Sequence, residues 1–161
     1  MFRNNSLINV FLELAGFTGL TSIAADAFNS SAISSVRLPA NIGSLGNNCL
    51  RFTQISTISV PEGCTSLGNH VFFGNVIQFV DLPSTFSSCS GHLLWQCRGM
   101  KTLICRSTTP PTITYDASFT DLPSTCKVYV PQASLNSYKS ASVWSKLANQ
   151  YLPIEGSEYE H

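Results

Sequence analysis

An internal repeat constrains the fold of this chain more than any other feature of its sequence. Three segments carry the same pattern of apolar residues, at residues 33–46, 55–68 and 77–90. Their prolines are equally spaced, at Pro39, Pro61 and Pro83, which gives a period of 22. A fixed period in the twenties is the signature of a solenoid, in which each repeat forms one coil and neighbouring coils share a core. The repeat therefore predicts a stack of similar coils.

Each repeat predicts a strand followed by a return arc. Val36-Arg37-Leu38 alternates apolar and polar residues, which is the period of a half-buried strand. Pro39 then ends the strand because it has no N–H to donate to the ladder. In the second half the apolar residues are three and four apart, which favours a short helix, a 3₁₀ turn or an irregular arc. Strands of neighbouring coils would lie about 4.8 Å apart in a parallel sheet.

Extending the template by whole periods in both directions predicts a single domain over residues 1–155. Its coils would span residues 7–30, 31–52, 53–74, 75–97 and 98–109. The first coil is degenerate, and in the last one Arg106 replaces the proline and one residue is inserted. A strand that ends at Pro131 and two short helices would form a C-terminal cap over residues 110–155, because a solenoid needs an atypical end unit. We expect residues 156–161 to be a disordered tail.

The composition excludes some classes of function. Lys and Arg number 9, as do Asp and Glu, so the basic surface of a nucleic-acid-binding protein is missing. Charged residues make up 11% of the chain, against roughly 25% in an average globular protein, which suits a secreted or cell-surface protein. No run of about 18 apolar residues is present, so the sequence predicts no transmembrane segment. If the natural protein is exported, we expect its signal sequence to have been removed from this chain.

Two repeat stretches and the C-terminal ending resemble a known family. Leu20-Thr-Ser-Ile23 with Ala27-Phe28, and Ile33-Ser-Ser-Val36-Arg-Leu38-Pro39, resemble the BspA-type leucine-rich repeat of bacterial surface proteins. The ending resembles the terminal unit of such proteins in gut Bacteroides-like bacteria, at Thr109-Pro110-Pro111, Val128-Tyr-Val130-Pro131, Tyr138-Lys-Ser-Ala141 and Val143-Trp144. The resemblance covers about residues 7–154, and the chain departs from the family pattern at Arg106 and in its shortness.

The resemblance implies an α/β solenoid of the leucine-rich-repeat type. It would be a right-handed curved stack with a parallel sheet on the concave face, short helical, 3₁₀ or irregular arcs on the other face, and a cap of one strand and helices. It would lie at the cell surface or be secreted, and would serve adhesion or protein binding. The family pattern contains no catalytic residues, so we expect no enzyme activity and no cofactor.

The six cysteines allow three interpretations. In the first, they fill core positions as small apolar residues, since the register places Cys49 with Val71 and Cys97 in the place of Phe52. In the second, one or more pairs form disulfides between adjacent coils. In the third, a zinc ion is bound by Cys89, His92, Cys97 and Cys105. A further alternative is a hydrolase in which His70 or His92 activates a cysteine nucleophile.

The outward side of the predicted parallel sheet is the candidate binding site. Strand alternation aims the polar and variable residues between the core positions at this one face. Repeat proteins often bind partners on such a concave face, and exposed apolar residues there can anchor a partner. The candidate ligand-binding residues are Ser35, Arg37, Thr57, Ser59, Phe79, Asp81, Thr102 and Ile104.

Three functions follow from these patterns. The first is a binding module for a protein or a glycan, including host extracellular molecules. The second is a structural spacer or stalk fragment of a larger surface protein, with no ligand of its own. The third is the cysteine- or zinc-dependent hydrolase. In addition, the edge strand expected at residues 11–14 offers unpaired backbone groups, which predicts self-association through the N-terminal end.

Overall fold

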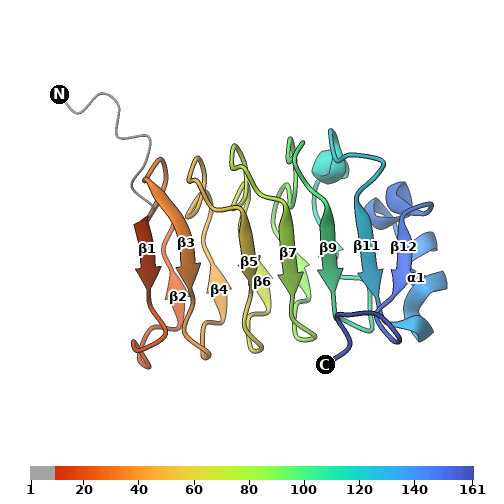
Figure 1. Cartoon of the computed structure of the whole chain (residues 1–161), viewed down its shortest axis with the longest axis horizontal. Coiled ribbons are helices and arrows are strands. Elements are labelled where there is room, and N and C mark those ends of the chain that lie inside the picture. The colour runs from red at the N-terminus through yellow and green to blue at the C-terminus, as the bar shows by residue number, and fades with distance from the viewer. Residues whose placement is uncertain (1–9) are drawn as a thin grey trace.

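The computed structural model describes residues 10–161, so residues 1–9, with the start of the first expected coil, lie outside the described residues. The chain winds into a stack of coils whose strands form two layers (Figure 1). The front sheet contains β1 (Val10–Glu13), β3 (Ile33–Arg37), β5 (Thr57–Ser59), β7 (Phe79–Leu82), β9 (Thr102–Cys105), β11 (Lys127–Val130) and β12 (Tyr151–Pro153). The back sheet contains β2 (Ser22–Ile23), β4 (Ser44–Leu45), β6 (Ser66–Leu67), β8 (Ser88–Cys89) and β10 (Thr112–Ile113).

All strand pairs of both sheets are parallel, as the stacking of coils predicts. The back sheet is continuous from β2 to β10. The front sheet is divided, because β1 pairs with β3 and a separate five-stranded ladder runs from β5 to β12. A single backbone bond from Gln54 N to the Ile33 oxygen, 2.8 Å long, bridges this division.

The return arcs of the repeats are not helical. Each contains a two-residue strand between turns, and the helices of the described residues lie in the C-terminal part of the chain. The reason is visible in the pairs Ser44-Leu45 and Ser66-Leu67. The serine is half-buried and the leucine buried, which is the two-residue period of a strand. The spacing of three between Ile42 and Leu45 spans a turn instead of a helical face.

The register corrects two details of the sequence alignment. In the first coil Leu12 pairs with Val36, whereas a strict shift by one period of 22 residues predicts Leu14 at this place. The back strands keep the regular spacing, with Ile23 beside Leu45, so the first coil has two extra residues in its turn. In the fourth coil Gln96 occupies the left-handed position of Phe52, so Cys97 does not take the place of Phe52.

Left-handed residues shape the turns that lead from the back sheet to the front sheet. One series recurs once in each period at Asp26, Asn48 and His70, with φ of 58°, 55° and 57°. A second series does so at Ser30, Phe52, Gly74 and Gln96, with φ of 60°, 54°, 71° and 58°. Because side chains other than Gly rarely adopt this conformation, its recurrence shows that the same turn is imposed on different sequences.

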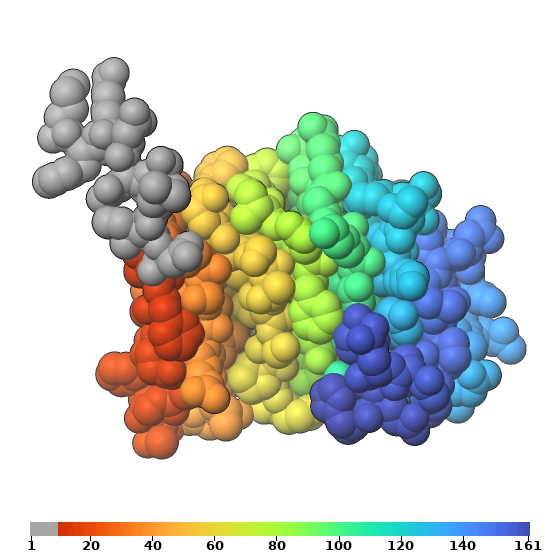
Figure 2. Space-filling model, in the orientation of Figure 1, coloured from red at the N-terminus to blue at the C-terminus, as the bar shows by residue number. Residues whose placement is uncertain are grey.

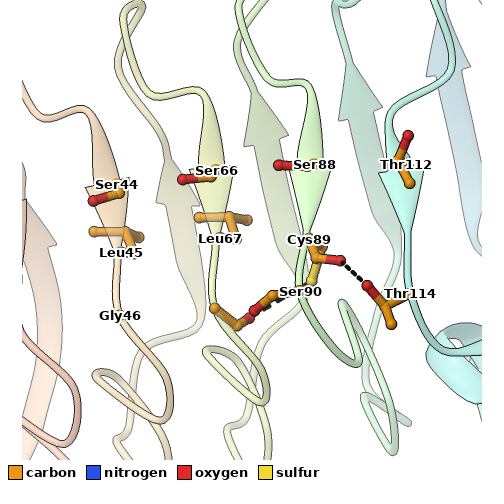
Figure 3. A pocket seen from close by; sticks show the side chains of 11 residues that line it. Ser44, Leu45, Gly46, Ser66, Leu67, Ser88, Cys89, Ser90, Thr112 and Thr114 are labelled. Carbon is orange, nitrogen blue, oxygen red and sulfur yellow. Dashed lines mark hydrogen bonds between the residues drawn. The ribbon is translucent and has the colours of Figure 1, made fainter.

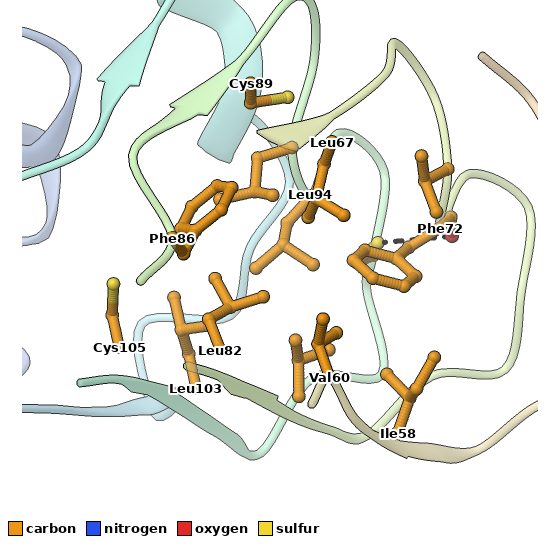
Figure 4. Close-up of a cluster of buried hydrophobic side chains, with 14 of the residues drawn as sticks. Ile58, Val60, Leu67, Phe72, Leu82, Phe86, Cys89, Leu94, Leu103 and Cys105 are labelled. Atoms are coloured by element: carbon orange, nitrogen blue, oxygen red, sulfur yellow. Dashed lines mark hydrogen bonds between the residues drawn. The ribbon is translucent and has the colours of Figure 1, made fainter. Parts of the chain in front are cut away.

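The core lies between the two sheets, where equivalent side chains of successive coils pack in columns (Figure 4). One column contains Ile58, Val80 and Leu103, which pair side by side in the front sheet and are buried. Each fully buried side chain of this kind contributes roughly 1.5–3 kcal/mol to folding. No single coil buries this apolar surface alone, so the stack holds together through contacts between neighbours.

The C-terminal part covers the last coil. It contains 3₁₀-helix η1 (Asp116–Phe119), β11, 3₁₀-helix η2 (Gln132–Ser134), α1 (Leu135–Ser140), 3₁₀-helix η3 (Val143–Leu147) and β12. Tyr138 and Trp144 are fully buried, and their polar atoms bond backbone oxygens at 2.8 Å, those of Ser107 and Pro111. The coil expected to end at residue 109 runs on, since β10 extends the back sheet.

Candidate functional site

The outward face of the front sheet, here called the front face, carries the eight residues predicted to bind a ligand. One row consists of Ser35, Thr57, Phe79 and Thr102. The other consists of Arg37, Ser59, Asp81 and Ile104. Parallel pairing aligns the members from β5, β7 and β9, and the buried Ile58, Val80 and Leu103 separate the two rows. The structure thus brings these residues together on one face, and their role in binding stays a prediction.

Phe11 and Glu13 also belong to the front face, and the sequence alignment missed them. They lie beside Ser35 and Arg37, and Phe11 is 57% exposed. Glu13 forms a solvent-exposed ion pair with Arg37, at 3.8 Å between Oε2 and Nη1. The alternation within Val10-Phe11-Leu12-Glu13 predicts that Phe11 and Glu13 share one face. The alignment by a fixed period of 22 residues instead displaced their pairing with Ser35 and Arg37 by two residues.

The C-terminal segment covers the other end of the front face, which differs from the disordered tail that we expected. In Figure 2 this dark blue segment lies across the C-terminal half of the solenoid. The ring of Tyr159 packs 5.9 Å from that of Phe79 and 4.8 Å from that of Tyr129. Ile104 lies in the same cluster with no exposed surface. Ile104 is therefore not an open binding residue, because a sheet residue beneath a packed segment is closed to a partner.

Arg106 ties this segment to the sheet. Its Nε and Nη2 donate to the two carboxylate oxygens of Asp81, each at 2.9 Å, and its Nη1 donates to the backbone oxygen of Tyr159 at 3.0 Å. Its Nη2 also lies 3.3 Å from Nε2 of His161. A two-pronged arginine–carboxylate pair is among the stronger polar contacts in proteins. Asp81 is therefore engaged within the chain.

The open half of the front face forms a shallow hollow of about 660 Å³. Its polar lining comes from Ser35, Arg37, Thr57 and Ser59, and Phe79 closes it toward the C-terminal segment. Arg37, Thr57 and Ser59 are exposed. Five of the eight predicted residues thus line this hollow, and three of them are exposed to a partner.

The back sheet carries a second hollow of about 390 Å³, shown in Figure 3. A row of small polar residues from successive coils lines it, namely Ser44, Ser66, Ser88 and Thr112. Thr114 Oγ1 donates to the backbone oxygen of Cys89 at 3.3 Å, so part of the polar lining is used internally. The hollow contains no charged group, which leaves it with little to hold a ligand.

The core interpretation of the six cysteines is confirmed. Every one of them is buried with at most 1% of its surface exposed, and each thiol is free. Burial raises the pKa of Cys97 to about 12 and that of Cys89 to about 11, so these thiols stay protonated at neutral pH. A nucleophilic cysteine needs the opposite shift. Within residues 10–161, no group of three or more His, Cys, Asp and Glu side chains is close enough to hold a metal ion.

The two histidines that the hydrolase interpretation uses as bases stack on each other instead of on a thiol. The rings of His70 and His92 have centroids 4.8 Å apart and are nearly parallel, at 4°. His92 Nδ1 lies 3.1 Å from the Asn69 Oδ1, which also accepts the His92 backbone N–H at 2.8 Å. The amide oxygen can only accept, so it favours the imidazole form with the proton on Nδ1.

These histidines belong to a group of stacked side chains that we name the aromatic patch. It consists of Arg51, Phe52, His70, Phe73, His92, Trp95 and Tyr115. One column runs from His70 through His92 to Tyr115, with 4.8 Å between successive rings. A second runs from Arg51 through Phe73 to Trp95, with 4.9 Å and 5.2 Å. Sequence reasoning missed the patch, although Arg51, Phe73 and Trp95 stand one period apart, which was a usable signal.

The comparison with protein families agrees with this architecture. The model of the BspA type leucine rich repeat region matches residues 1–101 in six copies. The chain belongs to this family. BspA-type repeats are typical of protein-interaction modules that are surface-exposed or secreted in bacteria, and the family is typically non-enzymatic.

The BspA-type assignment confirms the predicted recognition and fold class. The structure adds that a second parallel sheet forms the arcs of this BspA-type chain. A search of curated proteins finds no match to the chain. In the described part of the chain, no helix has the length and apolar character needed to cross a membrane.

Proposed function

We propose that the protein is a non-enzymatic adhesion module of a bacterial surface or secreted protein, of the Bacteroides type, which binds another protein through the open half of the front face. The observation that carries the proposal is the hollow of about 660 Å³ over β3 and β5, where neighbouring coils present exposed polar side chains. Leucine-rich repeats generally mediate protein interactions, which favours a protein partner over a glycan.

The chemistry of the hollow suits a polar partner surface. Arg37 offers a planar group of donors, and among the described residues only an exposed ion pair to Glu13 engages it. Thr57 and Ser59 add exposed hydroxyl groups that donate and accept. The absence of catalysis in the proposal is supported by the raised thiol pKa values and by the stacking of the histidines away from the cysteines.

A substitution that fills the hollow tests the proposal. Ser59→Arg places a long side chain in the hollow, while Ser22→Arg makes the same change at an exposed serine of the back sheet. Both variants and the original protein are applied to an array of purified extracellular proteins and oligosaccharides. We expect a protein ligand whose affinity falls at least tenfold with Ser59→Arg and is unchanged with Ser22→Arg.

Other outcomes of that array would contradict the proposal in distinct ways. A ligand that both variants bind as the original does would exclude the front face. Binding to oligosaccharides alone would replace the protein partner by a glycan. Binding to nothing on the array would favour the structural spacer.

Self-association through β1 is a second candidate function. Among the described residues β1 pairs with β3 alone, and Val10 and Phe11 are 37% and 57% exposed. A strand edge that no described residue pairs with, and that carries apolar side chains, is a template for pairing with another chain. We propose a dimer through this edge, measured by sedimentation equilibrium. Phe11→Lys should give the monomer, while Thr57→Lys on the same face should not, and a monomeric original protein would rule the dimer out.

A further inference from the structure

We propose that the aromatic patch is a second binding surface, which takes an acidic peptide segment of a protein partner and pairs its carboxylate with Arg51. The patch lies on the turns that lead from the back sheet to the front sheet, along the upper edge of the solenoid in Figure 1. It is separate from the front face, so the inference goes beyond the proposed function and does not depend on it.

The first observation is that Arg51 has no carboxylate partner within the chain. The other three arginines among residues 10–161 each pair with an acidic residue, in the pairs Arg37–Glu13, Arg98–Asp121 and Arg106–Asp81. All nine acidic residues of the chain lie in this described range, and none forms an ion pair with Arg51. Residues 1–9 contain no Asp or Glu, so no partner acid comes from there either.

The second observation is that Arg51 is held in place without being neutralised. Its guanidinium carbon lies 4.6 Å from the ring centre of Phe52 and 4.9 Å from that of Phe73. Its Nε is buried and has no hydrogen-bond partner among the described residues. Stacking on rings fixes the plane of a guanidinium and leaves its N–H donors at the rim. Binding a carboxylate there costs less side-chain entropy than binding it with a mobile arginine, because Arg51 is already ordered.

The Phe52 ring, which packs against Arg51, can take its position only because residue 74 is a glycine. A Cβ at Gly74 would lie 2.1 Å from Cδ1 of the Phe52 ring, so only glycine leaves room for the ring. Phe52 itself has the left-handed φ of 54°, which is unfavourable for a bulky residue. Phe52 is nevertheless 44% exposed, so burial alone does not hold its ring in this position.

The third observation separates a peptide from a sugar as the ligand. The rings of His70, His92 and Tyr115 use their faces to stack on one another, at 4° and 10° between planes. Phe73 and Trp95 are stacked too, at 30°. A sugar ring is held by an open aromatic face, whereas His92 and Phe73 each stack between two neighbours of their column. Aromatic groups of this kind pack well with aliphatic and aromatic side chains.

The composition of the patch fits a protein partner. Trp, Tyr and Arg are the residues most enriched among those that dominate the energy of protein interfaces. Here Trp95, Tyr115 and Arg51 lie within one contiguous group, linked by ring contacts through His92 and Phe73. The ligand that matches both the unpaired cation and the aromatic rings is a peptide segment in which Asp or Glu stands beside apolar residues.

The test selects peptides without assuming a sequence. A library of short random peptides displayed on phage is panned on the whole protein. The best peptide is then synthesised, together with a copy in which each Asp or Glu becomes Asn or Gln. Binding is measured for the original protein, Arg51→Gln, Arg51→Lys and the control Arg98→Gln, whose arginine is exposed and paired with Asp121. The melting temperature of each variant shows that it folds.

We expect selected peptides rich in Asp or Glu, whose affinity falls at least tenfold with Arg51→Gln and less with Arg51→Lys. The amide copy of the peptide should bind as weakly as the original peptide binds Arg51→Gln, and Arg98→Gln should bind normally. Peptides without acidic residues, equal loss with Arg98→Gln, or no selection at all would overturn the inference. A parallel array of oligogalacturonates and sulfated oligosaccharides would overturn it by binding in an Arg51-dependent manner where peptides do not.

Discussion

Arg106 holds Asp81 through two hydrogen bonds of 2.9 Å, from Nε to Oδ1 and from Nη2 to Oδ2. Both side chains are only 15% exposed. Arg106 stands at the position where Pro39, Pro61 and Pro83 end the strands of the other coils. The residue that departs from the repeat is thus the one that fastens the C-terminal segment to the sheet.

Replacing Arg106 should release the C-terminal segment and weaken the fold. Arg106→Ala leaves Asp81 without its partner in a largely buried position, and hydrogen bonds to charged groups are worth about 2 kcal/mol. We expect a loss of about this size in the free energy of unfolding, measured with urea. Carboxypeptidase should also remove residues 156–161 faster than it does in the original protein.

The matched control for Arg106→Ala is Arg98→Ala. Arg98 pairs with Asp121 at 3.1 Å, but its side chain is 72% exposed, and exposed pairs contribute at most about 1 kcal/mol. Equal effects of the two substitutions on stability and on carboxypeptidase digestion would show that the Arg106 contacts do not hold the segment.

The buried thiols should make the protein sensitive to alkali. Burial raises the pKa of Cys49 to about 12 and that of Cys64 to about 11, from 9.0. The folded state therefore favours the protonated thiol. This contribution is complete below pH 9 and is lost as the pH rises toward 11 or 12. The expected cost is about 1 kcal/mol per thiol for each pH unit above 9.

Urea unfolding between pH 8 and pH 10.5 measures this effect. Cys49→Ala, which places in this column the residue found at Ala27, should lose less stability over that range than the original protein does. Native thiols should also resist iodoacetamide at pH 8 and react after unfolding. Labelling of the native protein at the rate of free cysteine would contradict the burial of the thiols.

The stacked histidines should make the protein less stable in mild acid. Burial lowers the pKa of His70, and the charges of His92 and Arg51 lower it further, while burial lowers the pKa of His92. The folded state therefore favours neutral rings. Their contribution is present above pH 6.5 and is lost as the pH falls through the lowered pKa values.

Melting temperatures between pH 7 and pH 5 test the contribution of the histidines. His70→Asn introduces the residue that Asn48 provides at the same left-handed position of the previous coil. We expect this variant to lose less of its melting temperature in acid than the original protein. An identical decline in both proteins would show that His70 does not carry the effect.

Gly74→Ala should disturb the aromatic patch and the fold together. The added methyl group would collide with the Phe52 ring, and Gly74 has a left-handed φ of 71°. We expect a loss of more than about 1 kcal/mol in the free energy of unfolding. Ser30→Gly, at φ of 60° in the same series, should instead be neutral or slightly stabilising. A stable Gly74→Ala protein with an unchanged Phe52 environment, observed by ring NMR shifts, would contradict this packing.

The sequence predicted the parts of the fold that depend on periodicity. The strands of the front sheet, the buried columns and the burial of Cys49 all follow from equal spacing and alternation. The register of the first coil was predicted wrongly, because its turn contains two extra residues and Leu12 therefore pairs with Val36. A fixed period of 22 residues misaligns a strand wherever a turn contains an insertion, because the strand on one side of the turn is then displaced relative to the strand on the other side.

The sequence did not predict that the C-terminal segment covers part of the front face, because these contacts do not follow the repeat spacing. Nothing in the pattern of residues 156–161 announces that Tyr159 packs on Phe79 and Tyr129. Contacts of this kind join residues that lie almost half the chain apart, here Phe79 and Tyr159. Sequence could place Phe79, Asp81 and Ile104 on one face, but it could not show which of them a later segment would close.

The rings of His70, His92 and Tyr115 are 4.8 Å apart, so side chains of successive coils repeat at this spacing along the long axis of the molecule. An extended peptide presents side chains on one side only about every 6.6–6.8 Å. If such a peptide lay along this axis, its side chains would not stay aligned with those of successive coils, because the two spacings differ. A partner that contacts several coils must therefore cross them at an angle or have a repeat spacing close to that of the coils. The spacing of the stack thus restricts which ligands can bind, in addition to the chemistry of each side chain.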